Sequence, residues 1–416
     1  MNLRIGVVHL GLGAFYRAHP AVCTEEALRG SGGDWGILAA SLRHADAPAA
    51  LTAQDQLYTV EILGSRFTYR IAACIRASLA ATTQRAQLLS ALGSPQTHIV
   101  TLTVTEKGYC LGVNGELDVA NPEIADDLKA PGKPSSAIGW LAAGLATRYS
   151  SHRRPVTIVS CDNLHANGAK LRGAVAAFVE RSRPEMLPWL RDNVVYPETV
   201  VDCIVPAATD LSRARVEEAL GVQDLACVQR EPYSQWVIEN RFAGPRPAWE
   251  YGGAQIVADV TDYGRIKLHV LNTCHSALAY LGLPRGYSFV REAMADAELA
   301  QFLEALVSTE IAPALAPLAA EDYWQTVRSR FENPRIDHRL SQIAQDGALK
   351  LSERVFPLMI ANANAGAPVR RLARIVRGWI DLTGAGLDAA LSDPSLLPPA
   401  IRTNPVLRAA ISAAVA

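Results

Sequence analysis

The sequence predicts an α/β fold in two parts: an N-terminal doubly wound parallel sheet and a mostly α-helical C-terminal domain. The opening segment LRIGVVHLGLGAFYRAHPAVCTEEAL indicates a buried strand to Leu10, a glycine turn and a helix. WGILAASL at 35–42 follows as the next strand, which completes a βαβ unit. From Lys267 onward, segments such as VRRLARIVRGWIDLTG carry helical apolar spacing and little is typical of a strand. A chain of 416 residues is longer than a single core usually grows, so we expect domains at 1–258 and 259–416.

Two further strands are expected at HIVTLTV (98–104) and PVTIVS (155–160), and polar residues follow each of them. Ligands of open α/β sheets bind beyond the carboxyl ends of the strands, so a site is expected at these tips. The polar stretch at 114–136 is interpreted as a surface excursion. RFAGPRPAWEYGG at 241–253 is interpreted as a second loop-rich stretch.

Composition excludes several classes of protein. Hydrophobic residues make up 49% of the chain and charged residues 19%, with a net charge of −1. This profile is typical of a globular enzyme and gives no field that would recruit nucleic acid or an anionic membrane. Seven cysteines stand far apart without a tight pair, which favours reduced thiols in a cytoplasmic protein and no zinc site. No apolar run approaches the ~18 residues of a membrane span.

The glycine turn GLGAFYRAH holds Gly11 and Gly13, the first two glycines of a GxGxxG pattern, with Tyr16 at the third place. Glycines there allow a tight turn and let backbone N–H groups approach a pyrophosphate. The pattern favours a dinucleotide site of the Rossmann type, with an ordinary strand-to-helix turn as the alternative. The candidate cofactor-binding residues are Gly11, Gly13, Phe15, Arg17, Ser41 and Arg43.

Ser41 and Arg43 stand near the end of the second strand, where an acidic residue usually holds the ribose hydroxyls. Neither side chain can accept both hydroxyls, whereas Arg43 could pair with a 2′-phosphate. The residues themselves therefore leave NADP open beside NAD.

Lys267, Asn272 and His275 stand at i, i+5 and i+8 of the otherwise apolar segment YGRIKLHVLNTCH (263–275). In an α-helix, at about 100° per residue, all three share one face about 140° wide. Apolar surroundings push a lysine towards its neutral form, which is a usable general base near pH 7. The alternative is a helix whose polar residues face solvent. The chain has only six lysines, which favours a role for Lys267.

These residues belong to a longer series of motifs: GLGAFYRAH, TVTEKGY (103–109), SCDN (160–163), VVDCIVP (200–206) and Lys267-x4-Asn272-x2-His275. In this order they resemble the mannitol dehydrogenase family of polyol-specific long-chain dehydrogenases, from the first strand to about residue 350. The resemblance implies a Rossmann-type domain followed by a helical domain, and no metal. It also implies hydride transfer between a nicotinamide ring and a secondary alcohol or ketone.

The resemblance implies a role for five residues. Lys267 resembles the general base, and Asn163 and Asn272 resemble the pair of amides that bind the reacting oxygen. Two fixed N–H donors stabilise an alkoxide as an oxyanion hole does. His275 resembles the histidine that positions the substrate, and Asp202 resembles an acidic residue of the pocket.

The chain departs from the family pattern at Gly264, where a glutamate that assists proton exchange is common, and at Thr273-Cys274, where Gly-Ser is common. It also has Gln342 where the mannitol enzymes carry an arginine, eight residues before Lys350. These departures put the proton route and the shape of the pocket in question.

NPRIDHRLSQIAQDGALK (333–350) resembles instead the fructuronate reductases, a branch that reduces D-fructuronate to D-mannonate with NADH. Arg339 and Lys350 are the candidates to bind the substrate carboxylate. The alternative is that Arg339 pairs with Asp337 or Asp346 at the surface. NAD is the cofactor that this resemblance implies.

Other functions remain open. Mannitol 2-dehydrogenase, another polyol dehydrogenase and tagaturonate reductase are the alternatives within the family. Tyr263-x3-Lys267 has the YxxxK spacing of short-chain dehydrogenases, a spacing that occurs often by chance. A sensor that binds NAD(P) without catalysis is a different class, because a Rossmann unit does not guarantee chemistry. A zinc alcohol dehydrogenase is disfavoured by the absence of ligand spacing. The expected partner is a small sugar acid or polyol, and the expected state is a monomer or weak oligomer.

Overall fold

The computed structural model describes residues 3–112 and 114–415. It divides into two compact units, one ending at Val260 and the other beginning at Thr261, and each is described by itself. Within the described residues, no helix is both long and apolar enough to cross a lipid bilayer.

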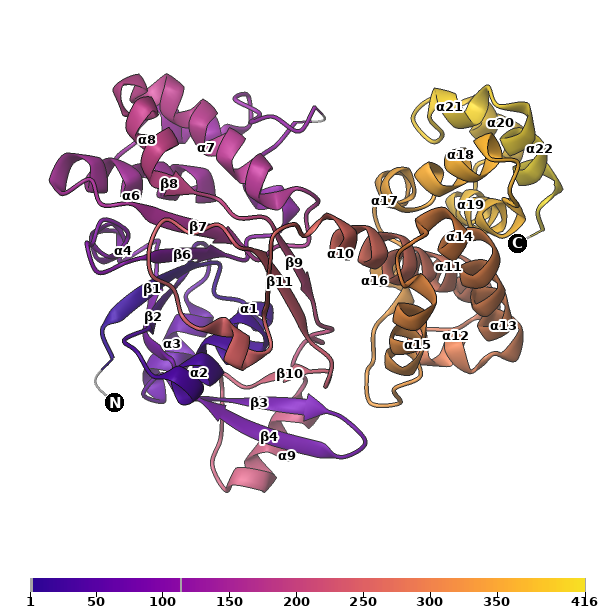
Figure 1. The fold of residues 1–416 in the computed structure, drawn as a ribbon. Coiled ribbons are helices and arrows are strands. Elements are labelled where there is room, and N and C mark those ends of the chain that lie inside the picture. Colours follow the sequence, from indigo (N-terminus) through magenta and orange to yellow (C-terminus); the bar gives the residue numbers. More distant parts are fainter. Residues whose placement is uncertain (1–2, 113, 416) are drawn as a thin grey trace. The chain divides into compact units, whose positions relative to one another are not determined.

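A six-stranded parallel sheet is the framework of the first unit (Figure 1). Its order is β5-β2-β1-β6-β7-β8, which is the 3-2-1-4-5-6 order of the doubly wound Rossmann fold when the strands are counted within the sheet. The strands are β1 (Ile5–Leu10), β2 (Gly36–Ser41), β5 (Ile75–Ala80), β6 (Ile99–Leu102), β7 (Val156–Ser160) and β8 (Val194–Val195). The predicted βαβ opening is confirmed, because β1 and β2 pair in parallel with helices between them.

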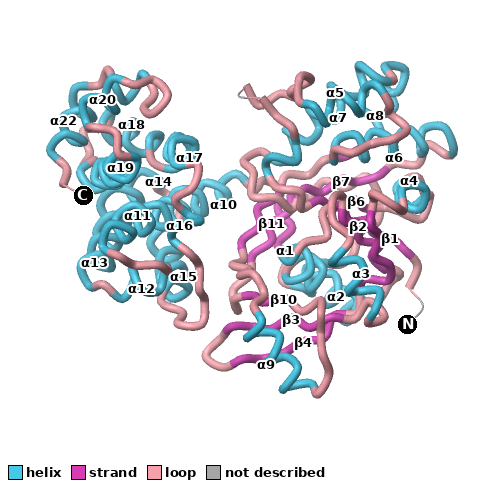
Figure 2. The backbone as a smooth tube through the Cα atoms, turned by 180° about the vertical axis from the view of Figure 1, so that it is seen from behind, coloured by secondary structure: helices cyan, strands magenta, loops and turns pink. Residues whose placement is uncertain are grey.

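Each face of this sheet is covered by its own hydrophobic core. Successive side chains of a strand point to opposite faces, so Val8 and Leu10 enter one core and Val7 enters the other. Figure 2 shows the helices on both sides of the strands. The core with Val8 contains residues of α4 (Arg85–Leu92), η1 (Glu106–Tyr109), α5 (Pro122–Lys129), α6 (Ala137–Ser151), α7 (Asn167–Ser182), η2 (Pro184–Met186) and α8 (Leu187–Asn193). The core with Val7 contains residues of α1 (Ala14–Ala18), α2 (Pro20–Ser31), α3 (Asp46–Ala53) and η3 (Trp249–Gly252).

Two small sheets complete the first unit, and they were not predicted as sheets from the sequence. One has the order β10-β3-β4 and the other β12-β11-β9. Their strands are β3 (Tyr58–Leu63), β4 (Phe67–Ala72), β9 (Thr199–Asp202), β10 (Val228–Arg230), β11 (Gln235–Glu239) and β12 (Gln255–Val257), and α9 (Asp210–Leu220) precedes β10.

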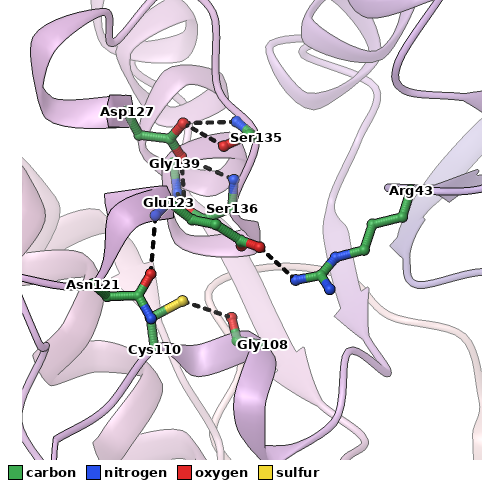
Figure 3. Close-up of polar contacts among 9 residues, drawn as sticks. All are labelled: Arg43, Gly108, Cys110, Asn121, Glu123, Asp127, Ser135, Ser136 and Gly139. Carbon is green, nitrogen blue, oxygen red and sulfur yellow. Dashed lines mark hydrogen bonds and ion pairs between the residues drawn. The ribbon is translucent and has the colours of Figure 1, made fainter. Parts of the chain in front are cut away.

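The stretch at 114–136 is more structured than the predicted surface excursion. Helix α5 forms there because Asn121 accepts a hydrogen bond from the Glu123 amide at 3.0 Å and Pro122 occupies the first helical position. The buried Asp127 accepts the amide and hydroxyl hydrogens of both Ser135 and Ser136 (Figure 3). These four hydrogen bonds hold α5 against the start of α6.

In the second unit, all of the regular secondary structure described at 261–415 is helical, which confirms the predicted mostly helical C-terminal domain. Its centre is α11 (Thr273–Gly282), in which all 10 residues are buried. The remaining helices are α10 (Thr261–Ile266), η4 (Lys267–Asn272), η5 (Leu283–Arg285), α12 (Val290–Ala295), α13 (Ala297–Leu306), η6 (Val307–Ile311), α14 (Ala312–Leu315), α15 (Ala320–Phe331), α16 (Leu340–Ile343), α17 (Gly347–Arg354), α18 (Phe356–Asn364), α19 (Arg370–Thr383), α20 (Leu387–Ser392), α21 (Pro399–Arg402) and α22 (Pro405–Ala413).

Candidate active site

Gly11 follows β1 where the strand order reverses between β1 and β6, and it must be glycine. Its φ is +100°, and a Cβ there would lie 2.1 Å from the carbonyl oxygen of Thr103. At Gly13, by contrast, a Cβ would meet one described atom within 4 Å, the Gly11 oxygen at 3.7 Å. The turn is therefore packed on the sheet side and open at Gly13. This is the crevice in which doubly wound folds bind nucleotides, and the residues present fit a dinucleotide.

A buried histidine fixes the carbonyl of Gly11. The Nε2 atom of His9 lies 3.0 Å from that oxygen, and Nδ1 lies 2.9 Å from Oγ1 of Thr101. Thr103 Oγ1 donates to the same Gly11 oxygen at 2.8 Å. Burial lowers the pKa of His9 to about 3, so the ring is neutral at ordinary pH.

Phe15 and Arg17 lie on α1, directly after the turn. Phe15 stacks on the ring of His19, with centroids 5.4 Å apart. Arg17 is buried; its Nε donates to the Gly13 carbonyl at 3.3 Å, and Nη1 donates to the carbonyl of Ala226. Burial also lowers the pKa of Arg17. In this structure Arg17 therefore supports the backbone of the turn.

Ser41 and Arg43 lie at the end of β2. Ser41 Oγ accepts the His44 amide at 3.3 Å. Arg43 extends to Glu123 of α5, and its Nη2 lies 2.7 Å from Oε1 (Figure 3). The Glu123 carboxylate therefore lies beside Arg43, the cation that was predicted to pair with a 2′-phosphate.

Asp162 joins the tips of β6 and β7. Its carboxylate accepts the amides of Val104 at 3.1 Å and Thr105 at 2.8 Å, and the hydroxyl of Tyr109 at 2.8 Å. Burial raises the pKa of Asp162, and these hydrogen bonds oppose the rise. The next residue, Asn163, is exposed at the tip of β7. Asp202, the other predicted site residue of this unit, ends β9 and is buried.

The predicted α-helix around Lys267 is helical, but residues 267–272 form a π-helix. In a π-helix the backbone hydrogen bonds join residues i and i+5, so residues five apart lie about one turn from each other. Lys267 and Asn272 have this spacing, and His275 follows one α-helical turn later. The angle of about 140° that a regular α-helix would give between Lys267 and Asn272 was wrong. The π-helix, called the π-turn below, gives the two side chains a smaller angle about the helix axis. All three side chains are buried, with exposed fractions of 7–9%.

Arg354 of α17 holds the end of the π-turn. Its Nη1 donates to the carbonyl of Asn272 at 3.3 Å and to Oγ of Ser276 at 3.1 Å. The Arg354 carbonyl in turn accepts the hydroxyl of Thr273 at 3.1 Å. Thr273, a departure from the family pattern, therefore has a structural partner.

His275 lies beside a second histidine, His338, which precedes α16. The two rings are nearly perpendicular, with centroids 4.9 Å apart, and Phe331 packs on His275 with centroids 4.4 Å apart. Burial lowers the pKa of His275 well below its usual range and that of His338 to about 4. The cations Arg330, Arg354 and Lys267 lower the pKa of His275 further. Arg330 and Lys350 do the same to His338.

The two cations predicted for a carboxylate differ in their surroundings. Lys350 Nζ donates to the Ile343 carbonyl at 3.1 Å and acts electrostatically on His338. Arg339 lies over the ring of Phe289, 5.3 Å from its centroid. Asp337, one proposed partner of Arg339, bonds instead to Arg291 at 2.8 Å. Among the described residues, no group of three or more His, Cys, Asp or Glu could hold a metal ion.

Comparison with known families decides the class of the protein. Residues 5–251 match the model of the mannitol dehydrogenase Rossmann domain, and residues 259–394 match that of the mannitol dehydrogenase C-terminal domain. The chain belongs to the mannitol dehydrogenase family. It is therefore an oxidoreductase of the class that acts on CH–OH groups.

Individual members of the mannitol dehydrogenase family resemble the chain along most of its length. D-mannonate oxidoreductase of Escherichia coli is 38% identical, over 92% of this chain and 80% of that protein. Mannitol 2-dehydrogenase of Phaeosphaeria nodorum is 34% identical, over 91% of this chain and 68% of that protein. The structure of Pseudomonas fluorescens mannitol 2-dehydrogenase with NAD and D-mannitol superposes with a TM-score of 0.88 at 33% identity, covering 99% of this chain and 91% of that one.

Four residues of this mannitol dehydrogenase family member were not predicted from the sequence as part of the site: His9, Asp162, His338 and Arg354. Asp162 could have been found, since it immediately precedes Asn163 at a strand tip. His338 stands in the segment that resembled the fructuronate reductases. The contacts of His9 and Arg354 join residues distant in sequence, and no local pattern indicates them.

Proposed function

We propose that the protein is an NAD-dependent fructuronate reductase, which reduces D-fructuronate to D-mannonate. The observation that carries this proposal is the charge around the histidine pair of the second unit. Four cations lie close enough to lower the pKa of these histidines. Lys267, Arg330 and Arg354 lower that of His275, and Arg330 and Lys350 lower that of His338. A positive environment favours a negatively charged substrate, whereas a neutral polyol gains little from it. The 38% identity with D-mannonate oxidoreductase supports the same substrate.

The chemistry assigned to this chain is a proton transfer coupled to reduction of a ketone. NADH, when bound, supplies the hydride that reaches the carbonyl carbon. Lys267, as an ammonium, gives its proton to the carbonyl oxygen, and the products are the secondary alcohol, NAD⁺ and a neutral lysine that regains a proton from water. The amide of Asn272 donates to the oxygen as its charge develops. In the oxidative direction, neutral Lys267 removes the alcohol proton.

NAD is the cofactor that we propose. The turn at Gly11 and Gly13 accommodates the pyrophosphate, and the solved mannitol 2-dehydrogenase of similar structure contains NAD. Glu123 beside Arg43 favours NAD over NADP, since its negative charge would oppose a 2′-phosphate. No disulfide links any of the seven cysteines, all of which lie in the described residues, and this supports a cytoplasmic location.

The test is the oxidation of NADH and NADPH by the purified protein with D-fructuronate, D-tagaturonate and D-fructose, in EDTA throughout. We expect D-fructuronate with NADH to give the highest kcat/KM. Preference for D-fructose would replace the proposal with a polyol dehydrogenase, for which the solved complex with D-mannitol is the precedent. Preference for D-tagaturonate would leave the substrate class, a sugar acid, unchanged and replace D-fructuronate by its epimer as the substrate.

Lys267→Ala separates an enzyme from a sensor. We expect it to abolish turnover and to leave the Kd for NADH nearly unchanged. Lys129→Ala is the control, because Lys129 is exposed and pairs only locally with Asp126 at 3.0 Å. Full turnover in Lys267→Ala would remove Lys267 from the mechanism.

A further inference from the structure

In the second unit, two buried imidazole nitrogens lack a hydrogen-bond partner among the residues that the structure describes. They are Nε2 of His275 and Nδ1 of His338. His275 is 93% buried, by its exposed fraction of 7%. Buried polar atoms are nearly always hydrogen-bonded, because an unpaired one loses its contacts with water and gains nothing in return. These two atoms lie on adjacent rings, so one ligand could complete both of them.

Hydrogen bonds on both sides of His338 fix the backbone there. Its carbonyl accepts the Val290 amide at 3.0 Å, and the Leu340 amide donates to Ser288 at 3.0 Å. Between these bonds, Arg339 forms an isolated antiparallel bridge with Phe289. The backbone from which the ring of His338 projects towards His275 is thus fixed, and the two ring centroids lie 4.9 Å apart.

The two histidines act as neutral donors among cations. Burial, the largest cause, keeps both pKa values low, and nearby positive charges lower them further. A neutral imidazole presents one N–H group and one lone pair. In the tautomers with hydrogen on Nε2 of His275 and Nδ1 of His338, two N–H donors within a cluster of positive side chains match the two oxygens of a carboxylate, which is an acceptor at both oxygens.

We propose that His338, together with His275, binds the carboxylate of the substrate and distinguishes a sugar acid from a neutral polyol. This assignment rests on the proposed function, because it requires a substrate that carries a carboxylate. Lys267 and Asn272, on the π-turn, then bind the reacting oxygen at the other end of the substrate. Lys350 contributes positive charge on the side of His338.

The test uses two ligands that differ only at one terminal carbon: D-mannonate, with a carboxylate, and D-mannitol, with a hydroxymethyl group. Binding to the NAD-bound enzyme is measured by calorimetry. The variants are His338→Leu and His338→Asn, which have nearly the same size and differ in polarity. We expect His338→Leu to weaken D-mannonate about 10- to 100-fold, the loss of one hydrogen bond to a charged group. His338→Asn should retain most of the affinity, because its amide can replace Nδ1.

The outcomes separate the two proposals. Unchanged D-mannonate affinity in His338→Leu overturns the carboxylate assignment. An equal loss of D-mannonate affinity in His338→Leu and His338→Asn also overturns it, because the imidazole would then contribute only its packing. An equal loss of D-mannonate and D-mannitol affinity overturns it too. If the wild-type protein does not bind D-mannonate, the proposed function fails and the assignment fails with it. NAD affinity, measured on each variant, shows that the fold is intact.

Discussion

The imidazole of His9 lies flat against the phenol ring of Tyr16, with ring centroids 3.2 Å apart and planes 3° from parallel. The ring is fully buried, and its nitrogens bond to Thr101 and to the carbonyl of Gly11. No water reaches it to solvate a positive charge. The turn at Gly11, which we propose binds the nucleotide, is thus supported by a histidine that the folded protein keeps neutral.

His9 should make the first unit less stable in mild acid. Its pKa is about 3 in the folded protein and 6.5 as a free side chain. Above pH 6.5 both states are neutral and pH has no effect. Below it the unfolded chain binds a proton that the folded one does not, so the free energy of unfolding falls until the pH nears 3. Between pH 6.5 and 5 the loss is about 2 kcal/mol.

Urea denaturation at pH 7.5, 6.0 and 5.0 measures this loss in the wild-type protein and in His9→Gln. The variant should be less stable at every pH and show a smaller decrease with acid. Parallel pH profiles for the two proteins would show that His9 titrates normally.

Gly11→Ala should destabilise the turn and weaken NADH binding. Its φ of +100° and the contact of a Cβ with the Thr103 carbonyl both oppose a side chain. Gly32→Ala is the matched control, since Gly32 also has a positive φ, +69°, but no described atom lies within 4 Å of its Cβ. The control should cost about 1 kcal/mol from strain alone and bind NADH normally. Equal NADH affinity in both variants would show that the shape of the turn at Gly11 does not matter for NADH binding.

Glu123→Gln should increase the use of NADPH. Loss of the carboxylate leaves the Arg43 guanidinium for a 2′-phosphate and removes a like charge. We expect the ratio of kcat/KM for NADPH to that for NADH to rise about fivefold. Glu116→Gln, an exposed change in the segment before α5, should leave the ratio unchanged. If the ratio of kcat/KM for NADPH to that for NADH stayed constant in Glu123→Gln, the adenosine ribose of the cofactor would not lie beside Arg43.

Asp162→Asn should separate the tips of β6 and β7. One of the two carboxylate oxygens that accept Val104, Thr105 and Tyr109 becomes an NH₂ group, which faces donors. We expect a loss of about 1–3 kcal/mol in the free energy of unfolding. Because Asn163 is adjacent, kcat should fall more than the affinity for NADH. Asp192→Asn, at an exposed residue, should change neither the free energy of unfolding nor kcat. If Asp162→Asn also changed neither, the strand tips would not depend on the Asp162 carboxylate.

The parts predicted from the sequence were those with a local signal. The β1-turn-α2-β2 unit was found because its strands are continuous apolar runs and Gly11 marks the turn. Lys267, Asn272 and His275 were proposed as site residues because they share one short segment, and the structure buries all three. The π-turn was not, because no pattern of apolar residues distinguishes it from an α-helix.

Long-range partners account for most of what was missed. Helix α5 carries buried Ile124 and Asp127 in a stretch of polar composition, and its partners Ser135 and Ser136 gave no helical signal. Strand β10 has three residues, too few for a periodicity to be visible. His338 was named only as part of a resemblance, since its partner lies in α11 and nothing near it in sequence indicates burial.

The pairing of β3 with β10 has a consequence for the order in which the chain is made. β3 pairs with β4 at once, but its other edge waits for Val228–Arg230. Asp224, which accepts the amide of Thr59 at 2.6 Å and bonds to Gln54 across 170 residues, emerges from the ribosome just before them. Until then a nascent chain exposes an open strand edge, which favours association with its neighbours. Arg17 also waits for its partner, the carbonyl of Ala226. The turn at Gly11 and Gly13 is thus completed only after the 209 residues that follow Arg17, up to Ala226, have been translated.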